Sequence, residues 1–203
     1  MEVLIVGGGK MGSAMALRLA KIGYNTTLAA YHPMNVRFRK QLAKARVIIT
    51  DFDGMPRNVD TIIIALRPEH LRIIQSISDN FSGIVIDASN SYPAAPQGFK
   101  TNFEYISSYF KNAKITKCFN VMGYENILNP VYEDQRADMV IAGDDLIAVQ
   151  KAQELSLELG FGNCYHLGGD EAAELLENIA KFWLRMSLQR RMGRDIAFKF
   201  LKR

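Results

Sequence analysis

The chain has 203 residues, of which 48% are hydrophobic and 23% are charged. This composition excludes a disordered chain, and the length suits one domain with a small appendage. No apolar run approaches the ~18 residues of a membrane-spanning helix. The two cysteines, Cys118 and Cys164, lack metal-site spacing and give no disulfide framework. Because Met1 leads directly into the first expected strand, we expect no signal peptide and a cytoplasmic protein.

The net charge of +4 is concentrated near the end of the chain. Residues 181–203 hold eight lysines and arginines against one acid, Asp195, so the rest of the chain carries a small net negative charge. This asymmetry argues against a nucleic-acid-binding protein.

Short apolar runs alternate with amphipathic segments along the chain. Expected strands, in chain order, span residues 3–6, 26–30, 47–49, 61–65, 84–86, 115–118, 139–142 and 164–167. Expected helices span residues 11–22, 69–78, 144–159 and 171–192. Several strands are apolar throughout, which is typical of strands covered on both faces. The stretch 89–102 is rich in Ser, Asn, Pro and Gly and predicts a loop.

This alternation predicts an α/β fold, a Rossmann-type doubly wound, mostly parallel sheet with helices on both faces and a C-terminal helical extension. We expect one domain over residues 1–184 and a basic amphipathic extension over residues 185–203.

A glycine-rich loop lies between the first expected strand and the first expected helix, with the pattern Gly7-x-Gly9-x-x-Gly12. At such a junction the first glycine makes a tight turn and the second lets the backbone approach a pyrophosphate. The third lets the helix lie close to the sheet. Free N–H groups and the helix dipole then stabilise the phosphate charge. We therefore predict a dinucleotide-binding loop; the alternative is a plain strand-to-helix turn without a ligand.

Further motifs follow the later strands in a fixed order. They are RPEH (67–70), DASN (87–90), KCFN (117–120), AGDD (142–145), LGF (159–161), LGG (167–169) and EN (177–178). With these motifs the chain resembles the deazaflavin-dependent (coenzyme F420-type) NADP oxidoreductases from residue 1 to about residue 184. It resembles equally the cytosolic reductase domain of the STEAP metalloreductases. The resemblance implies an NADP(H) cofactor and a flavin or deazaflavin as the second substrate.

Three candidate ligand residues, Arg67, Asn90 and Asn120, fall at the carboxyl ends of expected strands, where ligands lie in doubly wound sheets. The two amides could orient a carboxamide or a ribose, although Asn also favours loops without any ligand. The resemblance would place His70 close to the cofactor, whereas a surface histidine is the alternative. The candidate cofactor-binding residues are Gly7, Gly9, Lys10, Met11, Gly12, Tyr31, His32, Arg37, Arg67, His70, Asn90 and Asn120.

No pair of carboxylates, no Ser-His-Asp series and no Cys-His pair stands out for acid–base chemistry. Hydride transfer between two rings requires little proton chemistry from the protein, because the cofactor carries the reaction. The protein mainly has to hold the rings face to face. We therefore predict no catalytic side chain, and an NADP(H)-dependent oxidoreductase that passes hydride to a small-molecule flavin or deazaflavin-type acceptor.

The chain departs from the family pattern near the expected ligand surface. The positions where relatives carry a Ser-Arg pair for the 2′-phosphate of NADP are Ala30 and Tyr31. His166 stands where an Asp is usual, and Glu174 where an Arg is usual. A dinucleotide-binding sensor or regulatory protein without turnover is therefore an alternative function. A third possible function is that of an imine reductase, a class of enzyme that shares the glycine loop but needs a longer helical C-terminal domain.

We expect NADP(H) rather than NAD(H). NAD-specific folds end the second strand with an acid that binds the ribose 2′-hydroxyl, and here the first acid after that strand is Asp51. Basic residues near in sequence could approach a 2′-phosphate as charge-assisted donors. These are Lys10, His32, Arg37 and Arg39.

The basic extension carries an apolar stripe at four-residue spacing, formed by Leu184, Leu188, Met192, Ile196 and Phe200. We expect a helix with a break at Gly193. A basic amphipathic helix can lie on an anionic membrane surface, but we favour docking on its own domain or on the twin subunit of a homodimer.

Overall fold

The first strand, β1 (Glu2–Val6), lies inside an eight-stranded sheet of order β10-β9-β6-β5-β4-β1-β2-β3. The computed structural model describes residues 1–203, and all eight strands expected from the sequence are present. The others are β2 (Asn25–Ala29), β3 (Ile48–Thr50), β4 (Thr61–Ile64), β5 (Ile84–Asp87), β6 (Lys114–Cys118), β9 (Met139–Ala142) and β10 (Cys164–His166). Strand order reverses between β1 and β4, which is the switch point of a doubly wound sheet.

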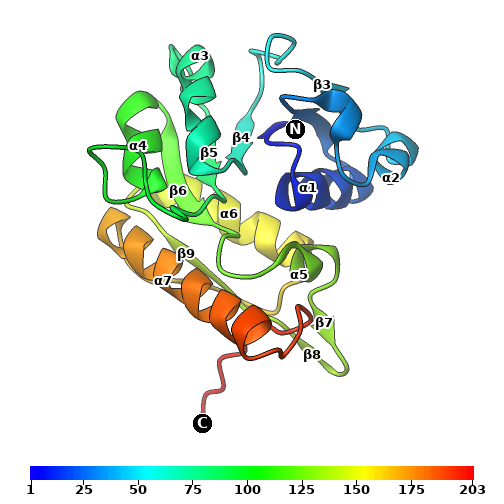
Figure 1. Ribbon diagram of the computed structural model, residues 1–203, viewed down its shortest axis with the longest axis vertical. Helices are drawn as coiled ribbons and strands as arrows, with labels where there is room; N and C mark the ends of the chain where they lie inside the picture. The colour runs from blue at the N-terminus through cyan, green and yellow to red at the C-terminus, as the bar shows by residue number, and fades with distance from the viewer.

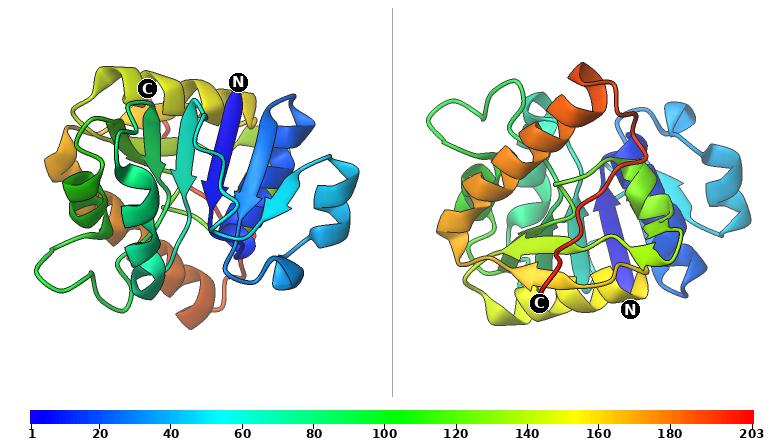
Figure 2. Two further views of the ribbon diagram at one scale, coloured as in Figure 1. Left: turned by 90° about the horizontal axis from the view of Figure 1, so that it is seen from above. Right: turned by 90° about the horizontal axis from the view of Figure 1, so that it is seen from below.

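Helices cover both faces of this sheet (Figures 1 and 2). They are α1 (Lys10–Lys21), α2 (Arg39–Lys44), α3 (Gln75–Ser78), α4 (Asn102–Tyr109), α5 (Tyr124–Leu128), α6 (Leu146–Glu158) and α7 (Ala173–Leu184). The expected helix over 69–78 begins as a 3₁₀ helix, Pro68–Ile74, before α3. No helix is both long and apolar enough to span a membrane. The predicted Rossmann-type fold is confirmed.

Alternate residues of β1 enter two separate hydrophobic cores, because successive strand residues face opposite sides of a sheet. Val3 and Ile5 belong to the core that contains buried residues of α1 and α6. Leu4 and Val6 belong to the core that contains buried residues of the 3₁₀ helix and α4. A β1 buried on both faces explains why its sequence is continuously apolar.

Two strands, β9 and β10, run opposite to the other six. β9 is antiparallel to β6, and β10 is parallel to β9. A parallel connection needs a crossover that returns the chain to the amino ends of the strands. After β6, however, the chain forms only α5 and a small hairpin, β7 (Val131–Tyr132) with β8 (Gln135–Arg136), and then enters β9 from the carboxyl edge.

The basic extension is helical only at its start. α7 continues as a π-helical turn, Arg185–Gln189, and residues 190–203 then form no regular element. The expected amphipathic helix over this last part is therefore wrong. Positive φ angles at Arg191 and Gly193 turn the chain, and residues 194–203 run back along the domain as an extended strap (Figure 2, right). We call this segment the C-terminal strap.

The C-terminal strap docks on its own domain, as favoured from the sequence. The Asp138 N–H donates to the Phe198 carbonyl at 2.9 Å, and the Phe200 N–H donates to Asp138 Oδ2 at 2.9 Å. The Trp183 indole N–H donates to the Ile196 carbonyl at 2.8 Å. The backbone of the strap thus finds partners in the domain rather than within a helix, which explains why it is extended.

Candidate functional site

The glycine loop joins β1 to α1 with close backbone contacts. A Cβ at Gly7, whose φ is +125°, would lie 2.4 Å from the Ala65 carbonyl oxygen, and a Cβ at Gly12 would lie 1.9 Å from the Gly7 carbonyl oxygen. These two glycines are required by the packing of the loop. Gly9 differs, because a Cβ there would meet nothing within 4 Å. The folded chain does not itself need a glycine at this position, so the open space over Gly9 fits a group that must reach the backbone.

The first turn of α1 can bind an anion. Gly9 is its N-cap, so no side chain accepts from the free N–H groups, and the first turn contains no acidic residue. A helix N-terminus with free N–H groups and a favourable dipole stabilises negative charge. The geometry therefore fits a pyrophosphate at this point.

Two hollows flank the glycine loop at the carboxyl ends of the strands. The first, which we call the β2–β4 hollow, has a volume of about 260 Å³. Its lining residues are Gly7, Gly8, Gly9, Ala30, Tyr31, His32, Asn35, Phe52, Ala65, Leu66, Arg67 and His70. Six of the twelve candidate residues lie here, and the lining contains no acid. The Tyr31 ring packs edge-on against His32 and lies near Phe52, which gives an aromatic wall suited to a purine base.

The second, the α5–α7 hollow, has a volume of about 180 Å³. Its lining residues are Lys10, Met11, Asn90, Asn120, Val121, Met122, Gly123, Tyr124, Ala180, Trp183, Leu184 and Arg194. Four further candidates from the sequence, Lys10, Met11, Asn90 and Asn120, are brought together here although they come from three segments of the chain.

Asn90 and Asn120 hold each other in place. The Asn120 amide donates to Asn90 Oδ1, and the Asn90 amide donates to the Asn120 carbonyl, both at 2.9 Å. This arrangement leaves Asn120 Oδ1 buried without a donor. A buried acceptor without a partner costs free energy, so an N–H group of a bound carboxamide would improve this site. The expected role of the two amides is thus compatible with their geometry.

Two candidates lie elsewhere. Arg37 is exposed and lines neither hollow, because the buried side chain of Val36 and the left-handed turn at Phe38 direct the chain away. Gly12 packs against the loop rather than lining a hollow. His166, expected near the ligand surface, lies on β10, the last strand at one side of the sheet, and lines neither hollow. Its ring nitrogen is 3.0 Å from the Gly143 carbonyl oxygen.

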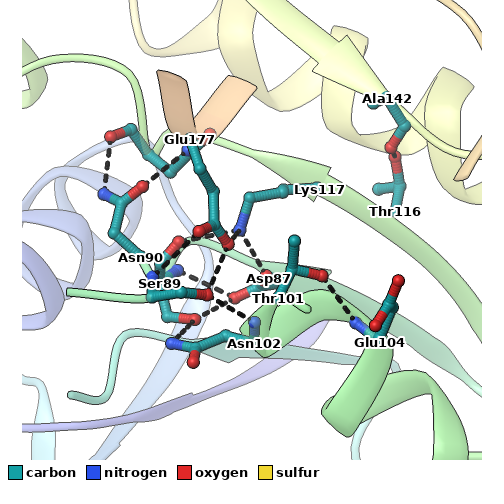
Figure 3. Close-up of polar contacts among 12 residues, drawn as sticks. Asp87, Ser89, Asn90, Thr101, Asn102, Glu104, Thr116, Lys117, Ala142 and Glu177 are labelled. Atoms are coloured by element: carbon teal, nitrogen blue, oxygen red, sulfur yellow. Dashed lines mark hydrogen bonds and ion pairs between the residues drawn. The ribbon is translucent and has the colours of Figure 1, made fainter. Parts of the chain in front are cut away.

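A buried ionic cluster lies between the strand ends and α7 (Figure 3). Lys117 Nζ lies 2.6 Å from Asp87 Oδ2 and 3.2 Å from Glu177 Oε1, and all three side chains are at most 3% exposed. Asp87 and Lys117 are paired in register on β5 and β6, and Glu177 comes from α7. The cluster was missed as a unit: its members lie in the DASN, KCFN and EN motifs, but nothing in the spacing shows that they meet.

Glu177 also holds the loop that carries Asn90. Its carboxylate accepts from the Ser91 hydroxyl at 2.9 Å and from the Ser91 N–H at 3.1 Å. Because Asn90 precedes Ser91 and α7 supplies Trp183 and Leu184 to the same hollow, the ionic cluster positions two walls of the α5–α7 hollow relative to each other.

Comparisons with known proteins agree with these observations. Residues 2–91 match a family model described as NADP oxidoreductase, coenzyme F420-dependent. Over 177 residues, 86% of this chain, the sequence is 26% identical to metalloreductase STEAP2 of Mus musculus, and over 182 residues it is 26% identical to that of Homo sapiens. The chain spans 35% of the length of these relatives. The resemblance stated from the sequence is confirmed.

Solved structures show the same fold. A candidate F420-dependent NADP reductase from Arthrobacter sp. FB24 superposes with a TM-score of 0.84 at 19% identity, covering 98% of this chain and 99% of that one. An imine reductase from Myxococcus stipitatus gives a TM-score of 0.66 at 16% identity, covering 94% of this chain and 62% of that one. These two likenesses show the fold, and the family model over residues 2–91 supports the predicted class of NADP-dependent oxidoreductases.

Proposed function

We propose that this chain, whose residues 2–91 match the F420-dependent NADP oxidoreductases, binds NADP(H) and transfers hydride between the nicotinamide and a flavin or deazaflavin-type acceptor. The observation that carries the proposal is the pair of hollows on either side of the glycine loop. A dinucleotide has two halves joined by a pyrophosphate, and the loop with its open Gly9 lies between two spaces that match those halves.

The residues present fit each part of the cofactor. The β2–β4 hollow offers Tyr31 to the adenine, and His32 and Arg67 to a phosphate. The N–H groups at the start of α1 would hold the pyrophosphate. The α5–α7 hollow offers the paired amides of Asn90 and Asn120 to the nicotinamide carboxamide.

The bound nicotinamide would supply the chemistry, a hydride that carries two electrons and one proton to the acceptor ring, with the acceptor's second proton coming from water. Neither hollow presents a carboxylate, and the protein's contribution is to orient the rings. His70 lines the β2–β4 hollow, away from the paired amides, so we assign it no proton transfer.

Oxidation of NADPH by added flavin, followed at the nicotinamide absorbance band, tests the proposal. We expect turnover that depends on the protein and saturates in both substrates. Tight NADPH binding without oxidation by flavins or a deazaflavin would contradict the enzymatic function and favour the sensor or regulatory alternative.

The proposal also covers the oligomeric state and the cellular location of the protein. We propose a homodimer, supported by an apolar groove of about 450 Å³ between α7 and the C-terminal strap. On it Leu175, Phe182 and Phe200 are each at least 50% exposed. The cytoplasmic location expected from the sequence stays a prediction.

A further inference from the structure

Arg194, in the C-terminal strap, lines the α5–α7 hollow although it lies ten residues beyond the end of α7. Its guanidinium lies over two aromatic rings, 5.0 Å from the centre of the Trp183 ring and 5.7 Å from that of Tyr124. Such contacts between a cation and an aromatic face hold the side chain in a defined place. Nothing in the sequence links this residue to the site.

A carboxylate fixes the orientation of this guanidinium. Arg194 donates through Nε to Glu125 Oε1 and through Nη2 to Glu125 Oε2, the second at 3.1 Å. Two parallel hydrogen bonds of this kind are geometrically specific. Gly123 makes the contact possible, because a Cβ there would lie 2.6 Å from the Trp183 ring and 2.9 Å from Arg194 Nη2. The contacts of Arg194 with Glu125 and Trp183 therefore hold the strap against the hollow.

The lining of the α5–α7 hollow is positively charged. Among the lining residues only Lys10 and Arg194 are charged, and both are basic. Lys10 Nζ also lies 5.4 Å from the centre of the Tyr124 ring. Glu125 offsets one positive charge from outside the lining, and the Arg194 side chain remains 35% exposed. The hollow thus combines aromatic walls with a net positive charge, which suits a planar molecule that carries an anionic group.

We propose that Arg194 determines acceptor specificity, by binding the phosphate of a planar redox acceptor whose ring lies against the nicotinamide at the open side of the α5–α7 hollow. Lys10 is the first residue of α1, directly after Gly9, and so lies beside the place proposed for the pyrophosphate. This leaves Arg194 as the cation of the lining for the second substrate. This inference rests on the proposed function, because it names the chemistry of the acceptor for the same site. It makes the C-terminal strap part of the substrate site.

Two flavins provide a matched test. Riboflavin and flavin mononucleotide share one ring system, and only the second carries a phosphate. Trp183 is the single tryptophan of the chain and lines the hollow, so its fluorescence reports binding there without turnover. Titrations with each flavin, in saturating NADP⁺, compare the wild type with Arg194→Gln and Arg194→Lys. The control is Arg203→Gln, which makes the same charge change at an exposed position of the tail.

We expect Arg194→Gln to raise the dissociation constant of the phosphorylated flavin by about tenfold, as for the loss of one charge-assisted hydrogen bond. Riboflavin binding should change by less than about twofold on the same basis, and Arg194→Lys should fall between wild type and Arg194→Gln for the phosphorylated flavin. Arg203→Gln should match the wild type. Unchanged NADP⁺ affinity in each variant would show that the dinucleotide site is intact.

Several outcomes would overturn this inference. An equal loss for both flavins would show that Arg194 only supports the wall of the hollow, and no loss for either would remove it from the site. Failure of the wild type to bind either flavin would also contradict it. In contrast, phosphate-dependent binding without NADPH oxidation would leave the Arg194 assignment standing and contradict the proposed enzymatic function.

Discussion

Lys117 on β6 and Glu177 on α7 form an ion pair of 3.2 Å that connects the sheet to the helix beside the α5–α7 hollow. Lys117 is fully buried and Glu177 is 3% exposed. With Asp87, the cluster buries two carboxylates around one ammonium group. Charges taken out of water are tolerated only when they are paired and hydrogen-bonded, so the geometry of this junction depends on all three residues.

We therefore expect Lys117→Met to destabilise the protein strongly, because it leaves two buried carboxylates without a cation. Removal of one partner from a buried ion pair typically costs about 3–5 kcal/mol. Urea unfolding measures this change. Lys151→Met is the control, since it removes a pair with Glu154 at the helix surface and should cost less than about 1 kcal/mol. Equal effects would show that the buried cluster is not important for stability.

Gly9→Val should separate binding from folding. The new Cβ meets nothing in the folded chain, so the unfolding midpoint should hardly change. A branched side chain would occupy the space needed by the pyrophosphate, and dinucleotide affinity should fall at least about tenfold, or about 1.4 kcal/mol. Titration calorimetry measures the affinity. Gly7→Ala provides the contrast: its Cβ would meet the Ala65 carbonyl, so it should lower stability. Unchanged affinity in Gly9→Val would place the phosphate elsewhere.

Preference for NADPH over NADH should depend on the β2–β4 hollow. Its lining includes His32 and Arg67 but no acid, so His32→Gln and Arg67→Gln should each lower the NADPH affinity more than the NADH affinity. Lys10 lines the other hollow, and Lys10→Ala should weaken both cofactors alike. Affinities measured at one salt concentration decide this. A wild type that binds NADH as tightly as NADPH would contradict the assignment.

Acid should weaken the attachment of the C-terminal strap at Asp138. Burial opposes ionisation of this carboxyl, but hydrogen bonds from the Phe200 N–H and from Lys199, both at 2.9 Å, outweigh it and lower the pKa of Asp138 from its ordinary value. A carboxyl with a lower pKa in the folded state stabilises the protein above its unfolded pKa. That stabilisation is lost as the pH falls through the folded value.

Urea unfolding at several pH values checks this. The wild type should be more stable than Asp138→Asn at about pH 6, and the difference should shrink below about pH 4. Asp134→Asn, a nearby exposed control, should follow the wild type throughout. A difference that is independent of pH would mean that the carboxylate charge does not hold the strap.

The proposed homodimer should dissociate when the apolar groove is made polar. Phe182 is 55% exposed in this groove, and a charge there would be costly to bury in an interface. Light scattering should show a dimer for the wild type and a monomer for Phe182→Asp. Ile147→Asp is the matched control, since Ile147 is 57% exposed on α6, outside the groove. A wild-type monomer would contradict the proposal.

Local sequence determined the strands and the glycine loop of this protein. The continuously apolar run of β1 follows from burial on both faces. The glycine pattern follows from one contact inside the loop, between Gly12 and the Gly7 carbonyl, and from one between Gly7 and the Ala65 carbonyl after the neighbouring strand. Candidates at strand ends, such as Asn90 and Asn120, also follow from the sequence, because parallel strands place their carboxyl ends at one edge. These features depend on short-range chemistry or on a simple rule of topology.

Only the tertiary structure decided how distant segments meet. The pairing of Glu177 with Lys117 joins residues 60 positions apart, and the contact of Arg194 with Glu125 joins residues 69 positions apart. The direction of β9 and the extended form of the strap were likewise set by partners elsewhere in the fold. Residue spacing does not predict such contacts. The spacing of residues in the basic extension is the same whether its backbone forms hydrogen bonds within a helix or with Asp138.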